Sequence, residues 1–185
     1  MPKDDGFAND PGVMDLFGST SEEPPDPMTP PLIFATLDDA VAFVQAGLDD
    51  GVECPCCKGF VRRYKRKFNA TMSRSLIWLV RAWEDNGQNW VDIPKNAPRW
   101  LVRSNQLPTV RWWGLVERPP SNDPAQKHSG LWRPTLKGVE FAHGRLKVPE
   151  RAVTFQGVVE DLIGQDVSVK DTLGTKFDYG ELMSA

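Results

Sequence analysis

The stretch from Asn69 to Phe141 constrains the fold most, because the spacing of its apolar residues changes in a set order. Three of its segments repeat apolar residues at helical spacing: residues 70–85, 97–103 and 106–113. The step Gly114-Leu115-Val116 follows the last of them and leads into a charged strand. A polar loop over 119–130 and a returning strand at 131–133 complete the stretch. The spacing therefore predicts three helices followed by a two-stranded hairpin.

Three helices and a hairpin in this order predict a winged helix-turn-helix. In its third helix Leu107, Val110 and Trp113 are expected to face the core, with Leu115 beside them. The fold class predicted for the whole chain is α+β, in four parts. They are a disordered acidic, Pro-rich tail (1–31), a helix with a Cys knuckle and a basic segment (32–68), the winged helix domain (69–148), and a C-terminal β-hairpin cap with short helices (149–185).

The flanking elements carry their own end signals. Thr36 is suited to cap a helix, whose expected buried stripe is Ala40, Val41, Phe43, Val44 and Leu48. Over residues 60–68 an aromatic residue recurs every fourth position among basic ones, which predicts an amphipathic basic helix or turn. Further along, Gln156-Gly157 predicts the tip of a hairpin, and Ser168 the start of a small helix. Residues 177–183 are apolar enough to pack back on the body.

Charge is strongly segregated along the chain, although the net charge is only −3. Residues 1–57 hold one Lys and twelve Asp or Glu, whereas residues 58–151 hold seven Lys, twelve Arg and seven Asp or Glu, a net charge of +12. Residues 152–185 are acidic again. A basic middle between acidic ends favours a polyanionic partner such as nucleic acid. The alternative is a solvated basic face that the acidic ends offset.

Other features exclude several classes of protein. No apolar run approaches the roughly 18 to 20 residues of a membrane span, and the N-terminus lacks the apolar region of a secretory signal. Three Cys within four positions cannot form a disulfide framework, so a reducing cytoplasm is expected. No phosphate-binding glycine loop, metalloprotease motif or serine-hydrolase motif is present. We therefore expect a protein that is not an enzyme.

The winged helix prediction supplies a set of DNA contacts. Such a fold places its third helix in the major groove, and the outward residues of that helix would be Gln106, Thr109, Arg111 and Trp112. Arg111 suits guanine and Gln106 suits adenine, while Thr109 suits a phosphate or a thymine methyl. Phosphate contacts are expected from the second helix and the wing: Arg99, Arg103, Lys127 and His128. A second basic patch consists of Arg62, Arg63, Lys65, Arg66 and Lys67. An exposed Trp112 would equally suit a protein interface.

The second half of the stretch resembles winged-helix transcription regulators of the multiple-antibiotic-resistance and phenolic-acid-repressor kind. The matching elements are Gly114-Leu115-Val116, Glu117-Arg118, the polar residues 121–129, and Thr135-Leu136-Lys137-Gly138. The chain departs from those regulators in placing Pro134 where they have Leu and in lacking long dimerisation helices. The resemblance implies a winged helix and double-stranded DNA as partner, with a homodimer left open.

From the Cys knuckle onward the chain also resembles small proteins of tailed phages and prophages. The shared features are a CPxC knuckle at 54–57, the YKRK segment at 64–67, the WGL step at 113–115, and the ending KFDYGELM at 176–183. Together the two resemblances imply a small phage or prophage DNA-binding protein that regulates transcription in the host cytoplasm. The alternative is a winged-helix adaptor that binds a host transcription or defence protein through Trp112 and the C-terminal tail.

Cys54 and Cys57 have the spacing at which two thiolates bind one zinc ion, and Cys56 lies between them. A structural zinc site needs four ligands, and no second CxxC pair exists. His128, His143 or a Cys pair from a second protomer could complete the site. The alternative is that the three Cys are reduced and bind no metal. No other cofactor is expected.

Overall fold

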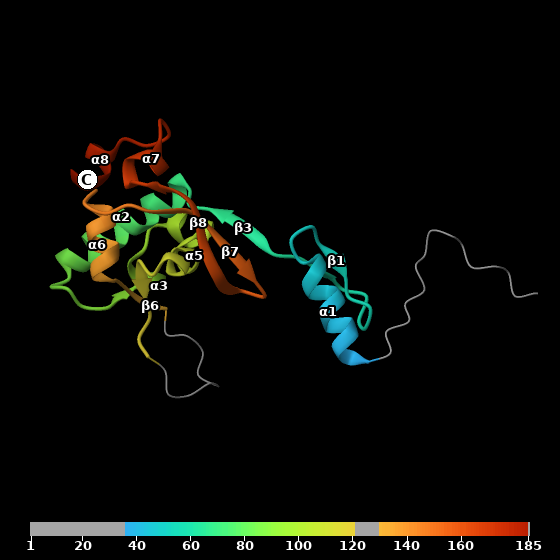
Figure 1. Cartoon of the computed structure of the whole chain (residues 1–185). Coiled ribbons are helices and arrows are strands. Elements are labelled where there is room, and N and C mark those ends of the chain that lie inside the picture. Colours follow the sequence, from blue (N-terminus) through green and yellow to red (C-terminus); the bar gives the residue numbers. More distant parts are fainter. Residues whose placement is uncertain (1–35, 121–129, 185) are drawn as a thin grey trace, which may run out of the picture. The chain divides into compact units, whose positions relative to one another are not determined.

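The computed structural model describes residues 36–120 and 130–184 (Figure 1). The predicted acidic tail lies outside the described residues, as do Lys127 and His128. The chain is an α+β protein in which the helices pack with short antiparallel sheets, as expected. No helix in the described ranges combines the length and the apolar character needed to cross a membrane.

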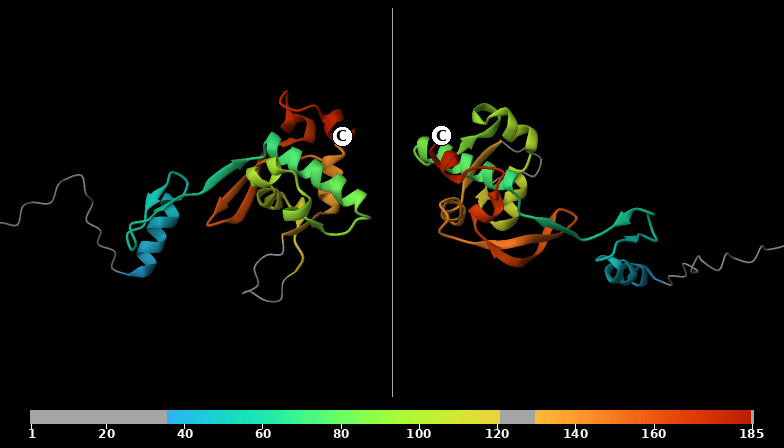
Figure 2. Two further views of the ribbon diagram at one scale, coloured as in Figure 1. Left: turned by 180° about the vertical axis from the view of Figure 1, so that it is seen from behind. Right: turned by 90° about the horizontal axis from the view of Figure 1, so that it is seen from above.

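Helix α2 (Ala70–Asp85) is the element on which most of the others pack. It begins at the predicted residue, because the Asn69 side chain accepts a hydrogen bond of 3.0 Å from the Met72 amide. Its buried side includes Leu76 and Val80, as the helical spacing predicted. Helices α7 (Val169–Leu173) and α8 (Tyr179–Ser184) lie on one side of α2, whereas α3 (Ile93–Asn96) and α5 (Leu107–Val110) lie on the other (Figures 1 and 2).

A small antiparallel sheet follows α2, and three short α-helices and a 3-10 helix lie between its first two strands along the chain. Its strands are β4 (Val91–Asp92), β5 (Val116–Glu117) and β6 (Leu131–Pro134), in the order β4-β6-β5. Between β4 and β5 the chain forms α3 (Ile93–Asn96), α4 (Arg99–Ser104), α5 (Leu107–Val110) and the 3-10 helix η1 (Arg111–Trp113). The predicted helices and hairpin of this stretch are therefore confirmed as elements. Helix α3 is an addition that begins at Ile93, directly after β4, and has Pro94 in its first turn.

Hydrogen bonds join the turn that follows η1 to the start of α6 (Leu136–Ala142). Gly114 has φ +69°, which a glycine adopts without strain, and this turn directs Leu115 into the core. Thr135 donates its amide to the Leu115 carbonyl (3.0 Å) and its hydroxyl to the Gly114 carbonyl (2.7 Å). A Cβ on Gly138 would lie 1.9 Å from the Leu115 oxygen, so α6 approaches this turn as only a glycine permits.

A second antiparallel sheet has the order β3-β7-β8. Strand β3 (Tyr64–Lys67) pairs with β7 (Val148–Phe155), which forms the predicted hairpin with β8 (Val158–Val167). The expectation of a basic helix or turn over this segment was wrong, because residues 64–67 are extended and bonded to a strand about 85 positions away. Phe68 follows directly and is fully buried.

The N-terminal module comprises α1 (Leu37–Gly47), β1 (Val52–Glu53) and β2 (Phe60–Val61). Thr36 caps α1 as predicted, in a reciprocal pair with Asp39. The predicted buried stripe was only partly right. Ala40 and Leu48 are buried, whereas 45 % of Val41 and 42 % of Phe43 are exposed. The module is too small to cover all the apolar positions of its helix.

Candidate nucleic-acid interface

The third helix, formed by α5 and η1, has the predicted buried face, whereas its predicted outward face is only partly exposed because Trp112 packs against the core. Asn105, at φ +47°, ends α4 and turns the chain into α5. Leu107, Val110 and Trp113 are buried, and the Trp113 indole N–H donates to the Pro149 carbonyl at 2.7 Å. The opposite face carries the four predicted contact residues, with Arg111 exposed and the other three half-buried: Gln106, Thr109, Arg111 and Trp112.

A groove of roughly 530 Å³ brings this helix together with the basic strand β3. From the third helix it is lined by Gln106, Thr109 and Trp112. Strand β3 and the start of α2 supply the other lining residues: Lys65, Arg66, Lys67, Asn69 and Met72. The third helix and the basic strand β3, which were predicted as two separate patches, therefore line one groove. The described residues that line it include no carboxylate.

The three basic residues of β3 differ in how strongly they are already neutralised. Lys67 forms an ion pair of 2.7 Å with Glu150. Arg66 lies 5.2 Å from the centre of the Tyr64 ring, a contact that leaves its charge unneutralised. Lys65 and Arg66 are both exposed and have no acidic partner among the described residues. They are the cations of the groove with the most capacity to attract an anion.

Arg62 and Arg63 differ in the same way. Arg62 is exposed and is in no ion pair of the described part of the chain. Arg63 lies 2.6 Å from a Glu160 oxygen and 3.6 Å from Asp49. The hydrogen bond to Glu160 raises the pKa of the Arg63 guanidinium. The Arg63 side chain therefore links β8 to the segment that precedes β3, and its charge is already paired.

Three predicted arginines project from the helices outside the groove. Arg99 and Arg103 lie one turn apart on α4, and both are exposed, as Arg111 is. A fourth arginine, Arg118, was not predicted as a contact. Desolvation, and then the charge of Arg111, lower the pKa of Arg118. Its guanidinium stacks 4.1 Å from the centre of the Trp132 ring.

Arg118 could have been found from the sequence by its position at the base of the hairpin. It follows β5 directly, where a winged helix brings its wing to the nucleic-acid backbone. Its Nε is buried without a hydrogen-bond partner among the described residues. Because Arg111 and Arg118 repel each other, an anion between them would be favoured by both.

The Cys knuckle is the loop that joins β1 to β2. Cys54 donates its amide to the Gly59 carbonyl, and the Lys58 amide donates to the Cys54 carbonyl, both at 2.8 Å. Hydrogen bonds from the backbone amides of Cys57 and Cys56 lower the pKa of the Cys54 thiol. All three cysteines are free thiols. In the described ranges no group of three or more His, Cys, Asp and Glu side chains is arranged to hold a metal ion.

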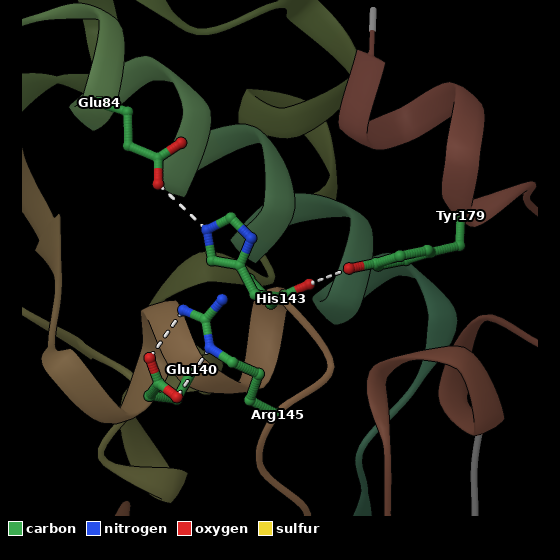
Figure 3. A network of polar contacts seen from close by, with 6 residues as sticks. Glu84, Glu140, His143, Arg145 and Tyr179 are labelled. Atoms are coloured by element: carbon green, nitrogen blue, oxygen red, sulfur yellow. Dashed lines mark hydrogen bonds and ion pairs between the residues drawn. The ribbon is translucent and has the colours of Figure 1, made fainter.

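His143 belongs to a separate polar network at the end of α6 (Figure 3). Its Nε2 lies 3.1 Å from a Glu84 carboxylate oxygen, which joins α6 to α2. Arg145 forms two hydrogen bonds with Glu140, and Tyr179 donates its hydroxyl to the Ala142 carbonyl at 2.9 Å. These contacts hold three helices together, so we assign His143 a structural role.

No known protein family, curated protein or solved structure matches the chain.

Proposed function

We propose that residues 69–148 form a winged helix-turn-helix domain and that the protein binds duplex DNA as a small transcriptional regulator of the phage or prophage kind. The supporting topology is the order α2, β4, α4, α5 with η1, β5 and β6, together with the sheet order β4-β6-β5. In such a fold the third helix reads base edges while the hairpin reaches the backbone. This is a proposal for a binding protein and not for an enzyme.

The observation that carries the proposal is the groove between β3 and the third helix. Its β3 wall offers the unpaired charges of Lys65 and Arg66, which suit phosphates. Its helical wall offers Gln106, which suits adenine once its amide leaves the Ser104 carbonyl, and Thr109, which suits a phosphate or a thymine methyl. A surface that places cations beside neutral hydrogen-bonding groups, without a carboxylate among its described lining residues, is complementary to a DNA strand.

Binding of a host protein is the second candidate, and the half-buried Trp112 favours it. An aromatic side chain at the edge of a groove is a common anchor in protein interfaces. The C-terminal tail, in contrast, gives this candidate little support. Phe177, Tyr179 and Leu182 are partly buried against the core, so part of their apolar surface is already covered.

Fluorescence anisotropy with a random DNA duplex at several salt concentrations separates the two candidates. Each phosphate contact contributes about 0.9 to the slope of log affinity against log salt, so the Lys65→Gln, Arg66→Gln double variant should flatten the slope by about 1.8. Arg111→Ala should weaken binding. Arg145→Gln is the matched control, because it removes a cation that is bonded to Glu140 outside the groove. Weak, salt-indifferent binding, or equal effects of the control, would reject DNA as the partner.

A further inference from the structure

The N-terminal module has too small a core to be stable by packing alone. Only Ala40 and Leu48 are buried among its apolar side chains, and neither belongs to the main hydrophobic cluster of the protein. Leu37 is 70 % exposed and Phe60 is 64 % exposed. Modules of this size are usually stabilised by a metal ion, a disulfide or association with another chain. Its cysteines are free thiols, so a metal ion and association with another chain remain as the means of stabilising it.

The turn of the Cys knuckle places its three cysteines along the same groove. Lys58 has φ +61°, a conformation that residues with side chains rarely adopt, and its amide closes the turn onto the Cys54 carbonyl. All three cysteines line one apolar groove of roughly 390 Å³. Its other lining residues include Leu37 and Val41 of α1, and Phe155 and Gln156 at the tip of the β7–β8 hairpin. The thiols therefore lie beside the apolar surface that the module leaves uncovered.

Cys54 and Cys57 supply half of a tetrahedral zinc site. The described residues of a single chain offer no cluster that completes it, since no group of three or more metal-binding side chains is arranged for an ion. His143 is bonded to Glu84 in the network at the end of α6. A second copy of this chain would add the missing pair of thiols, and it would also cover Leu37 and Val41. Dimerisation would therefore both complete the zinc site and cover the exposed apolar side chains of the module.

We propose that one zinc ion is bound between two copies of this chain, with Cys54 and Cys57 of each copy as its four ligands. The four thiols lose four protons to solvent, and four Zn–S bonds replace the S–H bonds without any change of oxidation state. Cys56 is not a ligand. The inference is independent of DNA binding.

Zinc content and molar mass, measured on the full chain purified after expression with added zinc, test this proposal. We expect one zinc per two chains by mass spectrometry of the metal, and a dimer by light scattering. Cys54→Ser and Cys57→Ser should each lose most of the zinc and yield monomers, and a strong chelator should do the same to the native protein. Cys56→Ser is the matched control and should keep both the zinc and the dimer.

Titration with Co²⁺ gives a second readout. The thiolate-to-cobalt absorption should reach its end point at half an equivalent per chain, and Cys54→Ser should abolish it. The tryptophan emission of the whole protein should stay native in both serine variants, because none of the seven tryptophans lies in the knuckle, which is outside the main cluster. One zinc per monomer, a dimer that survives chelation, or a zinc-free protein under these conditions would each overturn the proposal.

Discussion

Replacing Gly138 with Ala tests the contact that fixes the third helix against the hairpin. The new Cβ would lie 1.9 Å from the Leu115 carbonyl oxygen, whereas ordinary contact begins at 3.4 Å. That oxygen cannot easily move away, because it accepts the Thr135 amide and lies next to the Gly114 turn. Overpacking of this kind costs about 1–3 kcal/mol, and a backbone obstacle favours the upper end. The better helix propensity of Ala returns about 1 kcal/mol.

We therefore expect Gly138→Ala to lower the free energy of unfolding by about 2 kcal/mol, and Tm by about 4–8 °C for a chain of this length. Urea denaturation followed by tryptophan emission measures the change. Gly180→Ala in α8 is the control, because its Cβ would meet no backbone atom and would lie 3.1 Å from one side-chain oxygen of Asp178, which accepts the Glu181 amide. If Gly138→Ala is as stable as that control, the close approach of α6 to the Gly114–Leu115 turn is not present in solution.

Two further predictions use the same denaturation assay. Trp113→Phe should cost about 2 kcal/mol, because it leaves the Pro149 carbonyl without its 2.7 Å donor inside the protein and opens a gap; a loss below about 0.5 kcal/mol would contradict the contact. Hydrogen bonding to Arg145 lowers the pKa of Glu140, so the carboxylate stabilises the fold above the ordinary pKa of glutamate and stops doing so as pH falls through the lowered value. Glu140→Gln should therefore reduce the loss of stability on acidification, and unchanged pH dependence would refute this reasoning.

Local signals explain what could be predicted from the sequence. Asn69, Thr36 and Ser168 each cap the helix expected of them, because a cap is decided by the residue and the next three positions. The inward face of the third helix was also predictable. Its apolar residues recur at three-residue intervals, and Leu107, Val110 and Trp113 are all buried.

Pairing between strands that are far apart in the sequence explains why the helix or turn expected over residues 60–68 was wrong. An aromatic residue at every fourth position fits a helix, but four is also a multiple of the two-residue period of a strand. Residues 64–67 form a strand and not a helix because they pair with β7, in which Thr154 pairs with Tyr64 and Arg151 with Lys67. A strand partner about 85 positions away leaves no trace in the local pattern. The three sulfurs of the knuckle could likewise be named from the sequence, but the exposed apolar surface around them could not.

This pairing also determines whether the basic residues of β3 can act together with the third helix. Phe68 ends the strand and is fully buried, and its ring packs edge-on against Trp113 at 4.8 Å between ring centres. Its amide donates to the Glu150 carbonyl at 2.7 Å, which fixes the strand to β7 at the same point. Trp113 belongs to the third helix, so one aromatic contact sets the position of β3 relative to that helix. The cations of β3 and the polar residues of the third helix therefore line one groove because of a buried residue between them, and not because of any attraction between the two lining segments.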